Sequence, residues 1–365
     1  MKMSIPRRVL TFILSLSVLA IFLLNFAAMI IITLSGAMSG TTVPFYVIAI
    51  PFVFVDMLSP HFEIYWLALL VIVISIVLIF ILKDFIFWTK DMAKKELPKN
   101  SERFAVFTEL IVLLISFTYL SYFISMAVTN SSQPFGNPTS GVPTNYLLLT
   151  LLHAPVWEEF VYRGILLGIP LYLISYRKKL PWYRAIVGGK FGINGVSITI
   201  LIISAFFFGS AHLISWEPAK FPSAFVAGLV LGYLFLRYGI YMSIAGHFII
   251  DFMGSYSYIN SPFWGAMVVI SSLIMIVWFA AGFPYYWYYL RDMFYIGGKK
   301  TDYYAQPFFN NPQYQNYYQQ QYQNQQNYVL GYKIICPNCG YDQHRVLPDG
   351  RFQCLRCGTI FYYKK

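Results

Sequence analysis

The stretch APVWEEFVYRG at 154–164 places two adjacent acids, Glu158 and Glu159, and a base, Arg163, inside a strongly apolar part of the chain. An ionised group at the centre of a bilayer costs roughly 2.5–3.5 kcal/mol even on the mildest scale. On a helix, residues four apart share one face, so Glu159 and Arg163 can pair. Glu158 is rotated about 100° from Glu159. Two adjacent carboxyl groups held in different environments can take two chemical roles.

Two later apolar runs carry histidines at the same helical spacing. FFFGSAHL places Phe208 and His212 four apart, and IAGHFIIDF does the same for His247 and Asp251. Because charge facing lipid is not viable, these groups have to turn into a helix bundle or a wet cavity within it. Acids, imidazoles and an arginine from three runs would then converge on one site. The structural alternative is that intramembrane histidines only hydrogen-bond across helices.

Other polar groups in the apolar runs are assigned no chemistry. His153 lies near the start of its run, two residues before Pro155, and a packing or interfacial role is favoured. Glu109, Lys83 and Asp84 lie near predicted helix ends, where side chains can reach the interface.

The composition identifies the class of protein that has to position these residues. The chain has 365 residues, of which 58% are hydrophobic and 11% charged, whereas soluble domains carry about 25% charged residues. An integral membrane protein is therefore predicted. The net charge of +11 could indicate nucleic acid as a partner. Lysine and arginine fall mostly in short clusters between apolar runs, which is typical of cytoplasmic membrane loops and argues against that partner.

Apolar runs of about 20 residues, long enough to cross a bilayer, occur near 9–35, 62–88, 103–128, 145–176, 195–215, 219–237, 240–260 and 263–290. A ninth run at 43–58 is shorter and is interrupted by Pro51.

Loop charges predict the topology. The N-terminus and the segments 90–103 and 177–190 are basic, whereas the loop 130–145 has no charge. The positive-inside rule puts the three basic segments on one side, which requires an even number of crossings between them. The sequence therefore predicts an all-α polytopic protein of the cell membrane with about eight transmembrane helices and both termini in the cytoplasm. The run 43–58 is predicted to be interfacial or re-entrant.

The three motifs together resemble the CAAX protease and bacteriocin-processing (CPBP, or Abi) family of intramembrane proteins. Glu-Glu-x-x-x-Arg in APVWEEFVYRG matches its first motif, Phe208-x-x-x-His212 its second and His247-x-x-x-Asp251 its third, in the right order. The resemblance covers roughly residues 100–260. It implies an intramembrane endopeptidase. The best understood relatives are type II CAAX prenyl endopeptidases, eight-helix proteins that cut after a prenylated cysteine.

The resemblance also implies roles for the site residues. Glu158 would be the general base that activates a water, and His212 would help to hold that water. His247 and Asp251 would stabilise the oxyanion, while Arg163 would hold Glu159 as a supporting pair. Prenyl endopeptidases have Asn at the position of Asp251, and the Asn side chain can donate a hydrogen bond. The carboxyl group of Asp251 can donate one only when it is protonated. This departure weakens the implied specificity for prenylated proteins and the oxyanion role of residue 251.

Three alternatives use the same residues. A carboxylate and two histidines around an open position also resemble a catalytic zinc site, although the His-Glu-x-x-His helix typical of such proteases is missing. The resemblance favours a metal-free site without a cofactor. A transporter or proton relay would also place acids and histidines in a membrane, and a silent scaffold would use the cavity to bind a partner. The expected partners are the bilayer and a membrane protein or lipidated peptide as substrate.

Four domains are predicted: an N-terminal transmembrane region at 1–100, a protease-like core at 101–292, a Tyr/Gln/Asn-rich linker at 293–330 and a small unit at 331–365. The last unit contains Cys336-x-x-Cys339 and Cys354-x-x-Cys357 with fourteen residues between the pairs. This spacing resembles a zinc ribbon. Four cysteine ligands predict a closed, structural zinc site, with disulfides as the alternative. The partner of the ribbon is left open.

Overall fold

The structure is a computed structural model, and it describes residues 3–49, 52–58, 60–94, 98, 100–136, 141–177, 179–259, 261–297, 337–339, 344–346, 352–355, 357 and 359–361. The chain divides into two compact units, Met1–Gly298 and Lys299–Lys365. Residues 298–330 of the predicted linker, and Cys336, lie outside the described residues.

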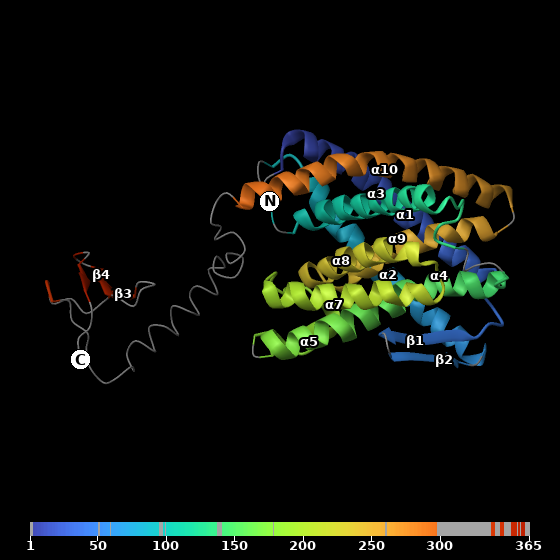
Figure 1. The fold of residues 1–365 in the computed structure, drawn as a ribbon, viewed down its shortest axis with the longest axis horizontal. Coiled ribbons are helices and arrows are strands. Elements are labelled where there is room, and N and C mark those ends of the chain that lie inside the picture. The colour runs from blue at the N-terminus through green and yellow to red at the C-terminus, as the bar shows by residue number, and fades with distance from the viewer. Residues whose placement is uncertain are drawn as a thin grey trace. The chain divides into compact units, whose positions relative to one another are not determined.

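The first unit is a bundle of helices with one β-hairpin (Figure 1). Its longer elements are α1 (Ile5–Leu34), β1 (Val43–Ala49), β2 (Phe52–Leu58), α2 (Pro60–Asp91), α3 (Glu102–Thr129), α4 (Thr144–Glu158), the π-helix η1 (Glu159–Gly168), α7 (Gly195–Ala211), α8 (Phe221–Arg237), α9 (Ile240–Phe252) and α10 (Pro262–Gly297). Short elements connect them: α5 (Ile169–Leu171), η2 (Tyr172–Tyr176), α6 (Arg184–Val187), η3 (His212–Ile214), η4 (Pro218–Lys220) and η5 (Met253–Tyr258).

The helices agree with the predicted apolar runs. Six of the described helices are long and apolar enough to cross a membrane, namely α1, α2, α3, α7 with η3, α8 with η4, and α10. The two other predicted spans are helical but irregular. The run at 144–176 alternates between α- and π-helix, and α9 has 13 residues before η5 begins. The chain is therefore a mostly helical, multi-pass membrane protein, and about eight spans fit this architecture.

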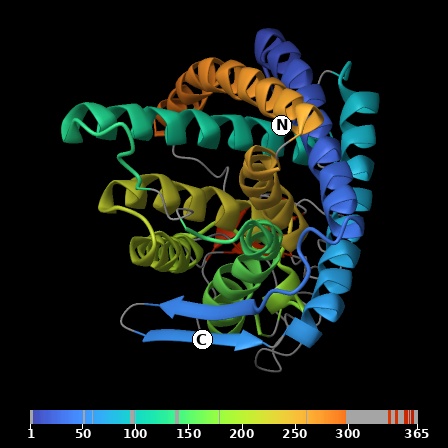
Figure 2. The ribbon, with the colours of Figure 1, turned by 90° about the vertical axis from the view of Figure 1, so that its right-hand side faces the viewer.

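The run 43–58 forms an antiparallel hairpin rather than a helix. β1 pairs with β2 from Val43↔Leu58 to Ala49↔Phe52, so the chain enters and leaves this region at the same end. No net crossing results, in agreement with the even number of spans predicted. The strands themselves were not expected in an all-α protein. Figure 2 looks onto this end of the unit and shows the hairpin lying beside the helices.

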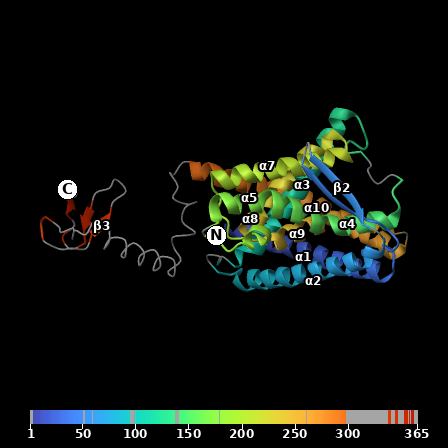
Figure 3. The ribbon, with the colours of Figure 1, turned by 90° about the horizontal axis from the view of Figure 1, so that it is seen from below.

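Polar contacts identify the helix ends that meet at the opposite end of the unit. Arg8 Nη1 donates to the carbonyl of Met92 at 2.9 Å, which joins the start of α1 to the end of α2. Arg237 at the end of α8 lies 3.6 Å from Glu102 at the start of α3. We call this the basic end; it comprises the described residues within 3–8, 90–103, 177–194 and 237–240. Figure 3 shows α1 and α2 running side by side.

The hairpin marks the other end of the unit. The backbone N–H of Thr41 donates to Glu63 at the start of α2 at 2.9 Å. The N–H of Glu217 donates to the carbonyl of Phe135 at 3.0 Å, which joins the connection between α7 and α8 to the loop after α3. We call this the hairpin end; it comprises the described residues within 35–63, 130–145, 212–220 and 253–262.

Two polar groups near helix ends are buried, which makes the expectation that they reach the interface wrong. Glu109 on α3 is 0% exposed and accepts from Arg7 at 2.8 and 2.6 Å. Asp84 on α2 is 3% exposed and accepts from Tyr241 on α9 at 2.5 Å. Such partners are needed because an unpaired charge in an apolar interior is strongly unfavourable. Both contacts join helices that are distant in sequence.

Small residues bring the helices close together, as in other membrane bundles. A Cβ atom at Gly228 of α8 would lie 2.8 Å from the Cα of Ala205 on α7. At Gly282 of α10 it would lie 2.1 Å from the Cβ of Ser116 on α3. A side chain at either position would push the two helices apart.

Candidate active site

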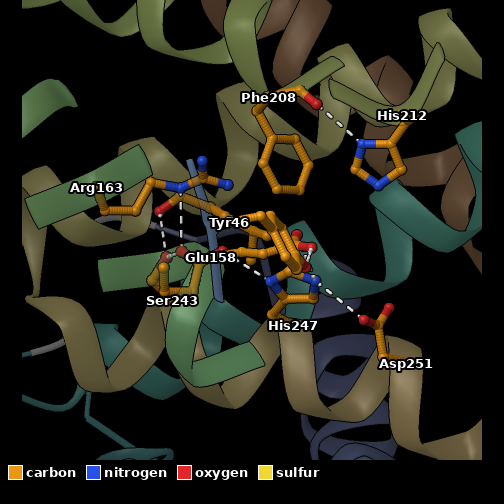
Figure 4. Close-up of polar contacts among 10 residues, drawn as sticks. Tyr46, Glu158, Arg163, Phe208, His212, Ser243, His247 and Asp251 are labelled. Atoms are coloured by element: carbon orange, nitrogen blue, oxygen red, sulfur yellow. Dashed lines mark hydrogen bonds and ion pairs between the residues drawn. The ribbon is translucent and has the colours of Figure 1, made fainter. Parts of the chain in front are cut away.

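Glu158 and Glu159 lie where α4 changes into the π-helix η1 (Figure 4). Pro155 inside α4 has no N–H to donate to the preceding turn, and π-helical turns are frequent at functional sites. The two carboxyl groups have different partners, as the sequence predicted from their rotation about the helix. Their exposures differ as well: the side chain of Glu159 is 0% exposed and that of Glu158 is 12% exposed.

Glu159 is held by three groups inside the bundle. Its Oε2 lies 3.0 Å from Arg163 Nε, so the predicted pair along the helix is present. Ser243 on α9 donates to the same oxygen, and His247 Nδ1 lies 2.8 Å from Oε1. The guanidinium of Arg163 also stacks 4.5 Å from the centre of the Phe208 ring. The charge of Glu159 is therefore neutralised and its oxygens are occupied.

Glu158 has a partner from outside the three motifs. The hydroxyl of Tyr46 on β1 donates to Glu158 Oε1, and Trp157 Nε1 donates to the backbone carbonyl of Tyr46 at 2.7 Å. Glu158 Oε2 has no hydrogen-bond partner in the described part of the chain. It lies 3.8 Å from His247 Nε2. One oxygen of Glu158 is thus available to accept a proton or a hydrogen bond.

His247 on α9 lies between carboxyl groups. Its Nδ1 faces Glu159 at 2.8 Å, and its Nε2 faces Asp251 Oδ2 at 3.1 Å. An imidazole can donate to carboxylates from both nitrogens only when it is doubly protonated. This arrangement therefore favours a positively charged His247 next to Glu158. The predicted pairing of His247 and Asp251 along one helix face is present.

His212 lies at the margin of the cluster. Its Nδ1 is 2.9 Å from the carbonyl of Phe208, so Nδ1 is the donor and Nε2 accepts when the ring is neutral. The Phe208 ring is 4.9 Å from the His212 ring and 5.8 Å from the His247 ring, and so lies against both. No hydrogen bond joins His212 to Glu158 among the described residues. Its predicted contact with the attacking water stays a prediction.

The helix ends explain how the three motifs come together. Residue counting from the ends of the predicted runs places His212 nearer the outer side than Glu158 or His247. In the structure α7 ends at Ala211 and α9 ends at Phe252. Because α9 ends at Phe252 rather than near residue 260, His247 and Asp251 lie closer to the end of their helix than the predicted run implied. They therefore lie toward the same end of the bundle as His212.

His153 takes part in packing, in agreement with the role favoured from the sequence. It is fully buried, and Trp66 Nε1 donates to its Nδ1 at 3.0 Å. Its ring stacks on Trp157 at 6.0 Å and meets Phe45 edge-on at 5.4 Å. This aromatic cluster fixes β1 against α4 and so positions Tyr46.

Two residues of the site were missed by the sequence analysis. Ser243 precedes His247 by four residues, and this helical spacing could have indicated it. Tyr46 lies 112 residues before Glu158, and no local spacing connects the two. Burial, followed by the neighbouring Glu158, raises the pKa of the Tyr46 hydroxyl above its ordinary value, so this group stays a donor.

The C-terminal unit contains a cysteine cluster. β3 (His344–Val346), β4 (Phe352–Cys354) and β5 (Ile360–Phe361) form a three-stranded antiparallel sheet. The Sγ atoms of Cys339, Cys354 and Cys357 lie within 4.8 Å of one another, and those of Cys339 and Cys354 are 3.5 Å apart. Thiolates around zinc at about 2.3 Å are separated by about 3.8 Å, so this geometry fits a metal ion. The acids and histidines of the membrane unit form no comparable ligand group among the described residues.

Comparison with protein families supplies independent information. Residues 141–253 match the family described as type II CAAX prenyl endopeptidase Rce1-like. The matched segment is similar to that family and comprises 113 of the 365 residues. It runs from the residues just before α4 to the end of α9 and contains all six membrane site residues named above, whereas Tyr46 lies outside it. No curated protein and no solved structure matches the chain. The match agrees with the resemblance to the CPBP family of membrane endopeptidases.

Proposed function

We propose that this protein is an intramembrane endopeptidase in which Glu158 activates a water molecule. The observation that carries the proposal is that the two adjacent acids differ in burial and in hydrogen-bond partners. Glu159 is fully buried and paired with Arg163, whereas Glu158 keeps one oxygen without a hydrogen-bond partner in the described structure, 3.8 Å from His247. A general base needs a free carboxylate oxygen within reach of the water from which it takes a proton.

The proposed reaction is hydrolysis of a peptide bond. Glu158 takes a proton from the water while the water oxygen attacks the carbonyl carbon. The carbonyl oxygen becomes an oxyanion, and the N–H of a charged His247 stabilises it. When the C–N bond breaks, the proton held by Glu158 passes to the leaving amine. His212, with its Nε2 as acceptor, would orient the water.

The proposed role of Asp251 differs from the oxyanion stabilisation that the family resemblance implies. Its Oδ2 lies 3.1 Å from His247 Nε2, and an ionised carboxylate cannot donate to an oxyanion. We therefore propose that Asp251 is a positioning residue that keeps His247 charged and oriented. Substrate binding would shift the Nε2–H of His247 from Asp251 to the oxyanion.

Tyr46 is proposed as a second positioning residue, because it fixes one oxygen of Glu158. The Tyr46→Phe variant is expected to lower kcat about 10–100-fold, since hydrogen bonds to charged groups contribute about 1.5–3 kcal/mol. KM and the thermal unfolding midpoint are expected to stay unchanged. Tyr65→Phe is the matched control, because Tyr65 is 75% exposed. A fall in thermal stability that accounts for the lost activity would contradict the positioning role.

The substrate is proposed to be a membrane-embedded or lipidated polypeptide, and C-terminal processing of prenylated proteins is the class implied by the Rce1-like match. The test uses purified protein with prenylated and unprenylated peptides of the same sequence, with and without chelator. Cleavage unaffected by chelator supports the glutamate mechanism over a catalytic zinc site. Loss of cleavage in a chelated protein whose ribbon cysteines have been replaced would favour zinc. Equal rates on both peptides would remove prenylation from the proposal.

We propose that Cys336, Cys339, Cys354 and Cys357 hold a structural zinc ion in a cytoplasmic ribbon. The Cys354→Ser variant is expected to lose most of the one zinc ion bound per chain, because a closed site needs all four thiolates. Metal content by atomic emission tests this, with Ser257→Ala as a control outside the ribbon. A full complement of zinc in the Cys354→Ser variant would contradict the ligand assignment. Cleavage in the membrane unit is expected to persist.

A further inference from the structure

Lys220 is a basic residue in a place where the stability of the helix does not favour one. It is the one lysine or arginine between Lys190 and Arg237, and it directly precedes α8 in a segment apolar enough to cross a membrane. A charged side chain in such a segment is costly. A positive charge is also unfavourable at the N-terminus of a helix, where the macrodipole favours anions. The presence of Lys220 therefore calls for a different explanation.

Two aromatic rings hold the ammonium group of Lys220. Its Nζ lies 4.8 Å from the centre of the Trp216 ring and 5.2 Å from the centre of the Phe135 ring. Phe135 belongs to the loop after α3 and is only 7% exposed. Its carbonyl accepts from the backbone N–H of Glu217 at 3.0 Å, which fixes this loop against the connection between α7 and α8. Cation–π contacts of this kind keep the charge at a defined position.

The charge of Lys220 lies beside the proposed active site. Trp216 follows His212 by one helical turn, and its backbone N–H donates to the His212 carbonyl at 2.9 Å. Electrostatic interactions join Lys220 to His212 and to Asp251. The side chain of Asp251 is 28% exposed, against 12% for that of Glu158. A substrate that reaches Glu158 from this more exposed side therefore comes near Lys220.

The ammonium group of Lys220 has no contacting anion in the part of the chain that the structure describes. Asp251 is instead engaged by His247 Nε2 at 3.1 Å. Glu217 is exposed and forms no ion pair with Lys220. A partly desolvated cation without an anion is stabilised when one binds. Because an ammonium group has three donors and no acceptor, the group that fits it is a carboxylate or another anion.

From these observations we infer that Lys220 is a specificity residue that binds a carboxylate of the substrate. The inference rests on the proposed function, because it names a group that is recognised next to that same site. The free carboxylate at the end of a polypeptide and the side chain of an acidic residue provide the same chemistry. If the ligand is the chain end, cleavage is confined to bonds that lie a few residues from a C-terminus.

The inference is tested with one prenylated peptide in three forms: the free acid, the C-terminal amide, and the amide with aspartate as its last residue. For the wild type we expect kcat/KM to be about ten-fold or more higher for a form with a carboxylate than for the plain amide. Preference for the free acid identifies the chain end as the ligand, and preference for the aspartate amide identifies the side chain. Equal rates for all three forms would overturn the inference.

Variants show whether Lys220 causes the preference. Lys220→Gln is expected to lower the rate with the carboxylate form to that with the plain amide, whereas Lys220→Arg keeps the charge and most of the preference. Lys179→Gln removes an exposed lysine at the basic end, and this matched control is expected to keep the full preference. If Lys220→Gln lowers the rates with all three forms by the same factor, the role of Lys220 is structural and the inference is wrong.

A binding measurement separates this inference from the proposed function. Fluorescence anisotropy with the same labelled peptides is carried out on Glu158→Gln and on Glu158→Gln/Lys220→Gln. We expect the carboxylate form to bind about ten-fold more tightly than the plain amide in the first variant only. That result, together with no cleavage by the wild type, would overturn the proposed function and support the inference. Cleavage by the wild type without any preference for a carboxylate would overturn the inference alone.

Discussion

Replacement of Glu158 by glutamine is expected to reduce peptide cleavage by about 10²–10⁴-fold, the range that general acid–base catalysis contributes. Glutamine keeps the size of the side chain and a carbonyl oxygen that accepts from Tyr46. It cannot take a proton from water at neutral pH. Binding of substrate is expected to persist, so the loss should appear in kcat, measured with the peptide that the wild-type protein cleaves.

A matched variant separates this effect from a general effect of removing a carboxylate. Glu217 is exposed on the connection between α7 and α8 and has no part in the proposed mechanism. Glu217→Gln is therefore expected to keep the wild-type rate. Unchanged cleavage by Glu158→Gln would refute the assignment of the base. A silent scaffold would show no Glu158-dependent cleavage and would retain partner binding in both variants.

Removal of the Arg163 guanidinium is expected to cost about 3–5 kcal/mol of unfolding free energy, as is typical when one partner of a buried ion pair is lost. Arg163→Met leaves the carboxylate of Glu159 inside the bundle, where both side chains are 0% exposed. The cost should lie toward the lower end of this range, because His247 still contacts Glu159 at 2.8 Å. Denaturant unfolding of the purified protein in detergent micelles measures the difference.

Two further variants show whether the cost comes from the uncompensated charge. The double variant Glu159→Gln/Arg163→Met removes both charges and is expected to recover most of the lost stability. Arg237→Met breaks a half-buried pair, 3.6 Å from Glu102 and with Arg237 28% exposed, and is expected to cost at most about 1 kcal/mol. If the double variant is as unstable as Arg163→Met, the loss comes from packing rather than from charge.

The hairpin supplies one residue of the proposed site, because the hydroxyl of Tyr46 on β1 donates to Glu158. The aromatic cluster around His153 packs this hairpin against α4. The family match covers 141–253 and stops short of this hairpin. Further features that set substrate choice in this chain are therefore expected among residues that the matched segment does not contain.

The sequence by itself determined the class of protein, its helical spans and the pairs that lie on one helix. Glu159 with Arg163, and His247 with Asp251, follow from the 3.6-residue period, because a spacing of four fixes the distance between side chains whatever surrounds the helix. The positions of the spans follow from hydropathy, since the bilayer requires continuous apolar runs. The pairing of Arg163 with Glu159 also follows from the bilayer, because a buried arginine needs an acidic partner within reach.

Only the tertiary structure decided which of the two adjacent glutamates keeps a free oxygen. His247, Ser243 and Tyr46 reach these carboxyl groups from other elements, and Tyr46 does so from a hairpin in a run whose secondary structure the sequence did not indicate. Such contacts depend on how helices cross and where each one ends, as the early end of α9 at Phe252 shows. The buried positions of Glu109 and Asp84 have the same origin. Local spacing contains no information about partners that the packing of distant segments supplies.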